Sequence, residues 1–270
     1  MGIRICFIVF LFYCFVGNSV AYNGFSGWWF VEGRGGTGVS VEMQGENTFV
    51  AIFDFNDFSP FWISSFGKVQ EMLIERGKPA GLFYMGNVYL FNGWPLGTSY
   101  VQPKTWVIGD MLIEFLSASE ANLEYVISKE FTTSGEEESV KVHLVKFMPT
   151  LFKGSSDSRD VNGWWYDHAF NGMGFFTEAY GDTIFMAWYH YAENNGPTWL
   201  SCYAPFTPED NQFTCTMQQW QGGSTMGASN YIAPRPQNLE DAVFKLTGEG
   251  RAELTWKGTT YHLERFIFSK

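Results

Sequence analysis

Three glycines are the first residues whose spacing suggests a chemistry. In "EGRGGTGVSVE", residues 32–42, Gly33, Gly35 and Gly38 have the G-x-G-x-x-G spacing of a dinucleotide-binding loop. Such a loop must lead into a helix whose backbone amides face the pyrophosphate. Here it leads into the strand-like run "VSVEMQG", and a second copy of the segment, at 168–174, reads "HAFNGMG" and keeps only part of the spacing. The glycines therefore predict a loop between strands, and we expect no NAD or other cofactor.

Two glutamates, Glu42 and Glu178, recur at the same place in the two copies. A glutamate in a half-buried strand most often pairs with a base. The expected partners are Lys146 and Arg265 near the ends of the copies, each across the intervening Trp strand of its own unit. Catalysis and direct ligand contact are the alternatives. Glycoside hydrolysis needs two carboxylates roughly 5 to 10 Å apart across a cleft. Neither unit shows a second such carboxylate, so a structural role is expected.

The four histidines suggest no catalytic constellation. His143 and His262 recur, each alone among strand residues, which is typical of a hydrogen-bonded edge or core residue. His168 and His190 occur only in the second copy, where they could serve as ligands or acid–base groups. No G-x-S-x-G elbow, H-E-x-x-H helix or Cys-His pair accompanies them. We therefore predict no catalytic residues and no metal site, and the sequence leaves enzyme activity as the lesser alternative.

Two cysteines, Cys202 and Cys215, lie in strand-like segments on either side of a turn at 208–210. A hairpin would place them face to face, and in an oxidising compartment they should form a disulfide. Zinc binding is the competing interpretation, but two thiolates without a further pair make an incomplete site.

Aromatic residues make up 19% of the chain, and several cluster in the second copy. Together with His190, these are the candidate ligand-binding residues: Tyr166, Trp188, Tyr189 and Trp199. With Trp220 they could stack on a sugar or enclose an apolar molecule, and Tyr189 would then line a hollow in the second unit. The alternative is that they fill the interior of a small barrel.

An internal repeat organises the chain. "GWWFVEGRGGTGVSVEMQGENTFVAIFDF", from Gly27, aligns with "GWWYDHAFNGMGFFTEAYGDTIFMAWYHY", from Gly163, at a constant offset of 136. "HLVKF" at 143–147 later matches "HLERF" at 262–266. The chain therefore reads as two units, 22–151 and 161–270, joined by the polar, turn-rich linker 152–160.

Each unit reads almost entirely as strand. In the second copy the expected strands are 163–167, 174–180, 183–191, 197–206, 212–220, 242–248, 252–256 and 260–268. Most links are short enough for hairpins, with one long connection at 221–241. Closing eight such strands on themselves removes exposed edges. We therefore predict an all-β fold of two tandem eight-stranded antiparallel up-and-down barrels.

The third strand of each unit, 48–55 and 183–191, is apolar on both faces instead of alternating. Such a strand is covered on both sides. We expect the two barrels to pack together there; a protein partner or self-association through these strands is the alternative.

Residues 1–21 have the features of a secretory signal peptide. Arg4 precedes an apolar run at 5–16, and small residues lead to a cleavage site near Ala21. The run is shorter than the roughly 20 residues of a membrane-spanning helix. We therefore expect a secreted or periplasmic protein without stable membrane insertion. With 28 acidic and 17 basic residues, the surface also repels nucleic acid.

Two resemblances follow from the Gly-Trp-Trp openings at Gly27 and Gly163. The chain resembles secreted bacterial tandem-repeat proteins with G-x-W-(Y/W) and G-x-G-(F/V)-x-x-E motifs, mostly uncharacterised. More distantly it is similar to calycin barrels, the lipocalins and avidins. That second likeness implies that the first-strand tryptophan of each unit lies beneath a basic side chain of the last strand, which pairs Trp29 with Lys146 and Trp165 with Arg265.

These observations favour a non-catalytic binding protein for a small apolar or carbohydrate ligand. A structural or protein-interaction module with packed barrels is the main alternative. A hydrolase and a sixteen-stranded outer-membrane barrel are lesser ones. Stretches such as "TSGEEESVKV", and the terminal Ser269 and Lys270, are too polar for the continuous lipid-facing band of an outer-membrane barrel.

Overall fold

The computed structural model describes residues 22–268 apart from 75–77, 98, 152–160 and 208. The predicted signal peptide, 1–21, and the predicted linker, 152–160, lie outside the described residues. Short helical turns accompany an otherwise all-β chain: η1 (Tyr22–Phe25), η2 (Lys129–Phe131), α1 (Phe147–Leu151) and η3 (His168–Phe170).

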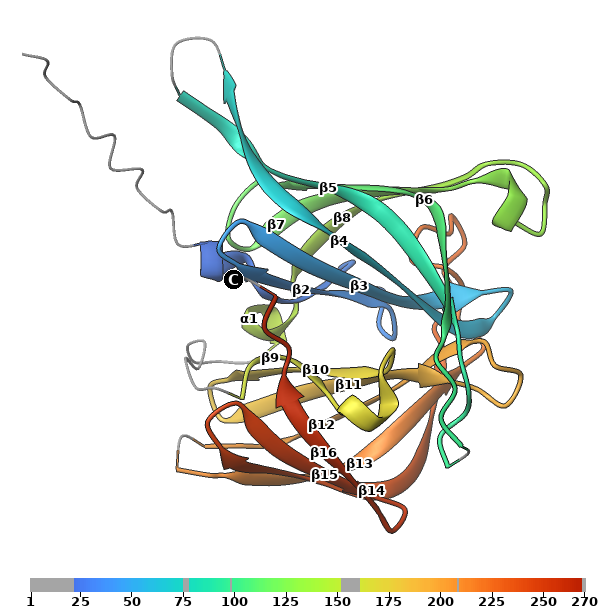
Figure 1. Ribbon diagram of the computed structural model, residues 1–270. Coiled ribbons are helices and arrows are strands. Elements are labelled where there is room, and N and C mark those ends of the chain that lie inside the picture. Colours follow the sequence, from blue (N-terminus) through green and yellow to red (C-terminus); the bar gives the residue numbers. More distant parts are fainter. Residues whose placement is uncertain (1–21, 75–77, 98, 152–160, 208, 269–270) are drawn as a thin grey trace, which may run out of the picture.

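The first half of the chain forms a closed antiparallel barrel in sequence order (Figure 1). Its strands are β1 (Gly27–Phe30), β2 (Gly38–Gln44), β3 (Asn47–Asn56), β4 (Ser59–Ile74), β5 (Lys78–Asn92), β6 (Lys104–Phe115), β7 (Glu120–Ile127) and β8 (Glu138–Lys146). Short links join most of the consecutive strands, so each strand pairs with its neighbour in sequence.

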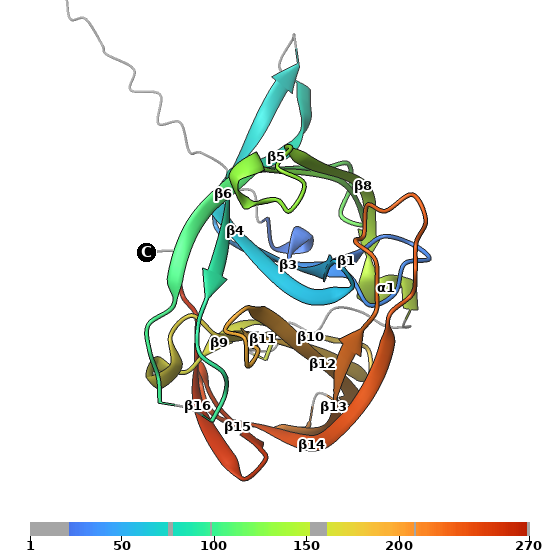
Figure 2. The ribbon, with the colours of Figure 1, turned by 90° about the vertical axis from the view of Figure 1, so that its right-hand side faces the viewer.

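The second half forms a second closed barrel of eight strands, which Figure 2 shows stacked against the first. Its strands are β9 (Gly163–Tyr166), β10 (Gly174–Tyr180), β11 (Thr183–Tyr191), β12 (Pro197–Pro205), β13 (Gln212–Gln221), β14 (Arg235–Gly248), β15 (Arg251–Trp256) and β16 (Thr259–Arg265). The prediction of two tandem up-and-down barrels is confirmed. Strand β14 begins at Arg235, earlier than expected, so the connection predicted at 221–241 shortens to 222–234.

Pairing of the first and last strands closes each barrel. Trp29 is in register with Lys146, and Trp165 with Arg265. The Lys146 ammonium lies 4.7 Å from the ring centre of Trp29, and the guanidinium carbon of Arg265 lies 5.5 Å from that of Trp165. Both expected contacts are therefore present, and each combines apolar packing with a cation–π attraction.

The third strands, β3 and β11, have two apolar faces with different neighbours. On β11, Met186 and Trp188 belong to the packed interior of the second barrel. Ala187 and Tyr189, on the other face, belong to a separate cluster that contains residues of both barrels, among them Ala51 of β3. The prediction that the barrels pack together through these strands is confirmed, and the alternation of side chains along a strand is the reason.

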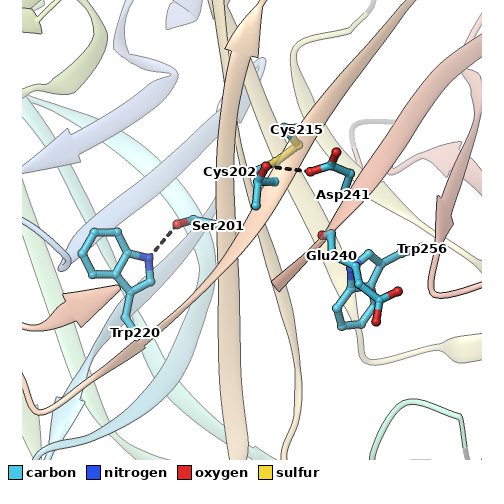
Figure 3. The surroundings of a disulfide bond; sticks show 8 residues. Ser201, Cys202, Cys215, Trp220, Glu240, Asp241 and Trp256 are labelled. Carbon is cyan, nitrogen blue, oxygen red and sulfur yellow. Dashed lines mark hydrogen bonds between the residues drawn. A yellow bond between two sulfur atoms is a disulfide. The ribbon is translucent and has the colours of Figure 1, made fainter. Parts of the chain in front are cut away.

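The predicted disulfide joins Cys202 on β12 to Cys215 on β13, with an S–S distance of 2.03 Å (Figure 3). The indole of Trp220, on the same pair of strands, donates a hydrogen bond of 2.9 Å to the hydroxyl of Ser201. The crosslink joins two neighbouring strands of the second barrel, β12 and β13. Trp220, on β13, faces the barrel interface.

Candidate ligand-binding sites

The two barrels exchange glutamates across their interface. The carboxylate of Glu178 accepts the backbone N–H of Trp28 at 2.7 Å, and that of Glu42 accepts the N–H of Trp164 at 2.7 Å. Gly27 has a φ of 126°, and a Cβ there would lie 2.5 Å from the Glu178 carboxylate. Glycine is therefore required at that position by both its backbone conformation and this close approach. Each glutamate thus fixes the first strand of the opposite barrel.

The basic residues complete this exchange. Arg265 of the second barrel forms a 2.8 Å ion pair with Glu42 of the first, and both side chains are largely buried. Burial raises the pKa of Glu178, although the charge of Lys146 opposes that shift. Burial lowers the pKa of Lys146 to about 8, against the attraction of Glu178. The predicted acid–base pairing is present, but it links the two barrels instead of lying within each, which gives these residues a structural role.

Two cavities flank this interface. Groove 1, of about 380 Å³, lies beside Trp28, and groove 2, of about 430 Å³, lies beside Trp164. The internal repeat relates their walls. Equivalent residues, groove 1 first, are Trp28 and Trp164, Phe53 and Tyr189, Phe147 and Phe266, Phe185 and Phe49, Trp199 and Trp62, and Ser201 and Ser64. The repeat has therefore produced the same aromatic cavity twice.

A stacked aromatic pair stands in the wall of each groove. In groove 1 the rings of Trp199 and Trp220 are 6.2 Å apart at an interplanar angle of 29°. In groove 2 the rings of Trp62 and Phe91 are 5.0 Å apart at 26°. Such faces offer flat apolar surface to a ring-shaped molecule.

One tryptophan in the wall of each groove also carries a buried indole N–H without a hydrogen-bond partner among the described residues. These donors are the Nε1 atoms of Trp28 and Trp164, both buried. A buried donor that stays unpaired costs free energy, so both positions favour a partner that brings an acceptor.

The structure distributes the predicted ligand-binding residues over four places, namely the two grooves, the core of the second barrel and a third cavity. Tyr166 and Tyr189 line groove 2, and Trp199 lines groove 1. Trp188 lies in the packed core of the second barrel. The expectation that Tyr189 would line a hollow inside the second unit is wrong, because the strand turns this side chain outward, where its hydroxyl lies 3.1 Å from that of Ser40.

His190 lies at a third cavity, the open end of the second barrel, which we call the second mouth. This cavity measures about 700 Å³, and the first barrel contributes residues 95–97 to it. The Nδ1 of His190 lies 3.1 Å from the carbonyl of Tyr191, while its Nε2 is buried and has no hydrogen-bond partner among the described residues. Burial lowers the pKa of His190 to about 4, so the ring is neutral near pH 7.

The equivalent position in the first barrel is Asp54, which was not among the predicted site residues. Burial raises the pKa of Asp54 to about 7. Its carboxylate accepts the backbone N–H of Met226 at 2.8 Å and the hydroxyl of Tyr125 at 3.2 Å. Two features of the sequence could have identified Asp54: it lies 136 residues before His190, and it is a charged residue within an otherwise apolar strand.

The remaining histidines are exposed: His143 lies on β8, His168 in η3 and His262 on β16. His143 lies 3.2 Å from the Asn122 side chain, and His168 lies 2.9 Å from Glu264. Among the described residues no group of three potential ligands is placed to hold a metal ion.

A scan against protein-family models, a search of curated proteins and a search of solved structures each found no match. Within the described part of the chain, no helix has the length and apolar character needed to cross a membrane.

Proposed function

We propose that this chain is a secreted, non-catalytic binding protein that takes small apolar molecules into grooves 1 and 2. The observation that carries the proposal is the duplication of the groove. Both halves of the repeat contribute equivalent aromatic side chains to two cavities of 380 and 430 Å³. Both volumes lie in the range of roughly 300 to 1,000 Å³ that is typical of small-molecule sites.

The chemistry of the walls favours a flat, apolar ligand that has one hydrogen-bond acceptor. The stacked pairs Trp199–Trp220 and Trp62–Phe91 supply ring faces. The buried indole N–H groups of Trp28 and Trp164, which have no partner among the described residues, would supply donors. A carbohydrate needs many polar partners, and aromatic side chains dominate both walls. An apolar ketone or ether therefore suits the grooves better than a sugar.

Secretion is supported by two features of the chain. Residues 1–21 have the charge and apolar pattern of a signal peptide. The Cys202–Cys215 disulfide fits an oxidising compartment.

The protein-interaction alternative rests on the packed interiors of the barrels. It predicts that the grooves are only imperfections of an interface that holds two barrels together. Binding of a small molecule at two equivalent sites would decide between the two functions.

The test is a fluorescence titration with prodan, a naphthalene ketone that is apolar and has a carbonyl acceptor. We expect two binding sites per chain. Trp220→Ala should remove one site and Phe91→Ala the other, because each substitution removes one ring of a stacked pair. Both side chains are only half-buried, so the fold should survive.

Trp106→Ala is the matched control, since Trp106 is an exposed aromatic residue on β6 that lines neither groove. This variant should keep both sites. Absence of prodan binding in the wild-type protein, or unchanged binding in the Trp220→Ala/Phe91→Ala double variant, would overturn the proposal and favour the interaction module.

A further inference from the structure

The two barrels exchange their longest connections as well as their glutamates. The connection between β5 and β6, described at 93–97 and 99–103, reaches the second barrel, and the connection 222–234, between β13 and β14, reaches the first (Figure 2). The N–H of Gly93 donates to the carbonyl of Asn195 at 3.0 Å, and that of Gly222 donates to the carbonyl of Phe58 at 3.1 Å. These matching anchors show that the two connections are equivalent parts of the repeat.

At the first barrel this exchange fills the open end. Met226 is fully buried in the core of the first barrel, although it belongs to the second half of the chain. Its backbone N–H donates to Asp54, and Arg34 donates to the carbonyl of Ala228 at 2.8 Å, which fixes the connection in place. This open end of the first barrel, which we call the first mouth, is thus occupied by an apolar group with a hydrogen-bond donor directed at a buried acceptor.

At the second barrel the same exchange leaves a space. Leu96 packs on the core of the second barrel but stays half-buried, and a cavity of about 700 Å³ remains beneath the connection. His190, at the position equivalent to Asp54, lines this cavity, and its Nε2 acceptor is buried just beneath the cavity wall without a partner among the described residues. Because Nδ1 faces the carbonyl of Tyr191 and must donate to it, Nε2 has the free lone pair.

The walls of the second mouth define the rest of the occupant. Leu200, Trp256 and Tyr261 form the apolar part of the lining. Thr198 and Gln219 add polar groups to it, while Glu193 and Lys257 lie at its exposed edge. A body of one or two rings fits this lining. A carboxylate has no donor for Nε2, and an ammonium group would lose its hydration against an apolar wall.

We propose that the second mouth is a binding site, separate from the grooves, for a small neutral molecule with an apolar body and a hydroxyl group that donates to Nε2 of His190 when a slight turn of the ring brings this atom to the cavity surface. The molecule takes the place that Met226 takes in the first barrel. It differs from the groove ligand because it must supply a donor and not an acceptor.

The test compares 2-naphthol with 2-methoxynaphthalene, which has the same rings but no donor. Calorimetric titrations use the Trp220→Ala/Phe91→Ala protein, so that binding to the grooves does not contribute. We expect 2-naphthol to bind about tenfold more tightly, the factor that one net hydrogen bond to a buried group gives. In the His190→Phe version of that protein the two molecules should bind equally.

A second substitution keeps the test decisive if His190→Phe does not fold. Leu96→Trp fills the mouth from the half-buried connection and leaves His190 in place, so it should abolish binding of both molecules. Two results would overturn the proposal. One is equal affinity of 2-naphthol and 2-methoxynaphthalene for the Trp220→Ala/Phe91→Ala protein with His190 intact, and the other is binding that survives Leu96→Trp. Neither result depends on prodan binding to the grooves, so the two proposals fail separately.

Discussion

The mouths of the two barrels have the same topology but opposite contents. In the first, Met226 fills the space and its N–H satisfies Asp54. In the second, Leu96 covers the space only in part, and Nε2 of His190 is left without a partner among the described residues. The barrels themselves are alike, so the difference comes from what each exchanged connection brings to the other barrel. A repeat can therefore conserve its strands and still diverge at its connections.

The acceptors at the two mouths also respond to pH in opposite directions, and Asp54 should give the largest effect. Its pKa rises from 3.8 to about 7 on folding, so its contribution to stability is full below pH 3.8 and is lost as pH rises to 7. In the wild type the free energy of unfolding should therefore fall by on the order of 4 kcal/mol over that range. We expect Asp54→Asn to remove this fall. Urea unfolding at a series of pH values measures it.

The control for this change is Asp57→Asn, because Asp57 is exposed and lies three residues away in the turn that follows β3. It should leave the pH dependence as in the wild type. If Asp54→Asn and the wild type lose stability equally between pH 4 and 7, the buried carboxyl of the first mouth does not titrate as described.

His190 should make the free energy of unfolding depend on pH in the opposite direction, with a slightly smaller effect. Its pKa falls from 6.5 to about 4 on folding, so its contribution is full above pH 6.5 and is lost as pH falls towards 4. In His190→Gln this loss, about 3 kcal/mol, should disappear. The same unfolding series measures it, with the exposed His143→Gln as the matched control. A wild-type slope in His190→Gln would contradict burial of a neutral ring in the second mouth.

Truncation of the two exchanged connections tests the difference in filling directly. Met226→Ala should cost about 2 to 3 kcal/mol, because it removes a fully buried side chain and leaves a cavity. Leu96→Ala should cost less than about 1 kcal/mol, since Leu96 is half-buried above a cavity that already exists. Midpoints of urea unfolding at constant pH give both values. Equal costs would mean that the two mouths are filled to the same degree.

The strands and their pairing could be predicted because local signals determine them. The 136-residue offset identifies the repeat, and short links force neighbouring strands to pair. The doubly apolar runs 48–55 and 183–191 predicted the contact between barrels, which the structure confirms. These features depend on residue type and spacing alone.

The contents of the sites could not be predicted in the same way. Met226 lies in a connection without periodicity, so nothing in its surroundings indicates that it enters the other barrel. The grooves depend on how two aromatic faces meet, which no single strand specifies. The repeat showed that Glu42 and Glu178 are equivalent, but it does not show that each would serve the opposite barrel.

The two exchanged glutamates should differ in how much their charge contributes to stability, and this is the smallest of the expected effects. Glu42 has a direct 2.8 Å ion pair with Arg265, whereas burial raises the pKa of Glu178 in spite of the nearby Lys146. Removal of charge should therefore cost less at Glu178. We expect Glu178→Gln to destabilise the protein by about 1 kcal/mol less than Glu42→Gln, since an amide oxygen can still accept the backbone N–H in each case. Urea unfolding of the two variants under one set of conditions measures this difference, and a larger cost at Glu178 would show that its charge is the more important one for holding the barrels together.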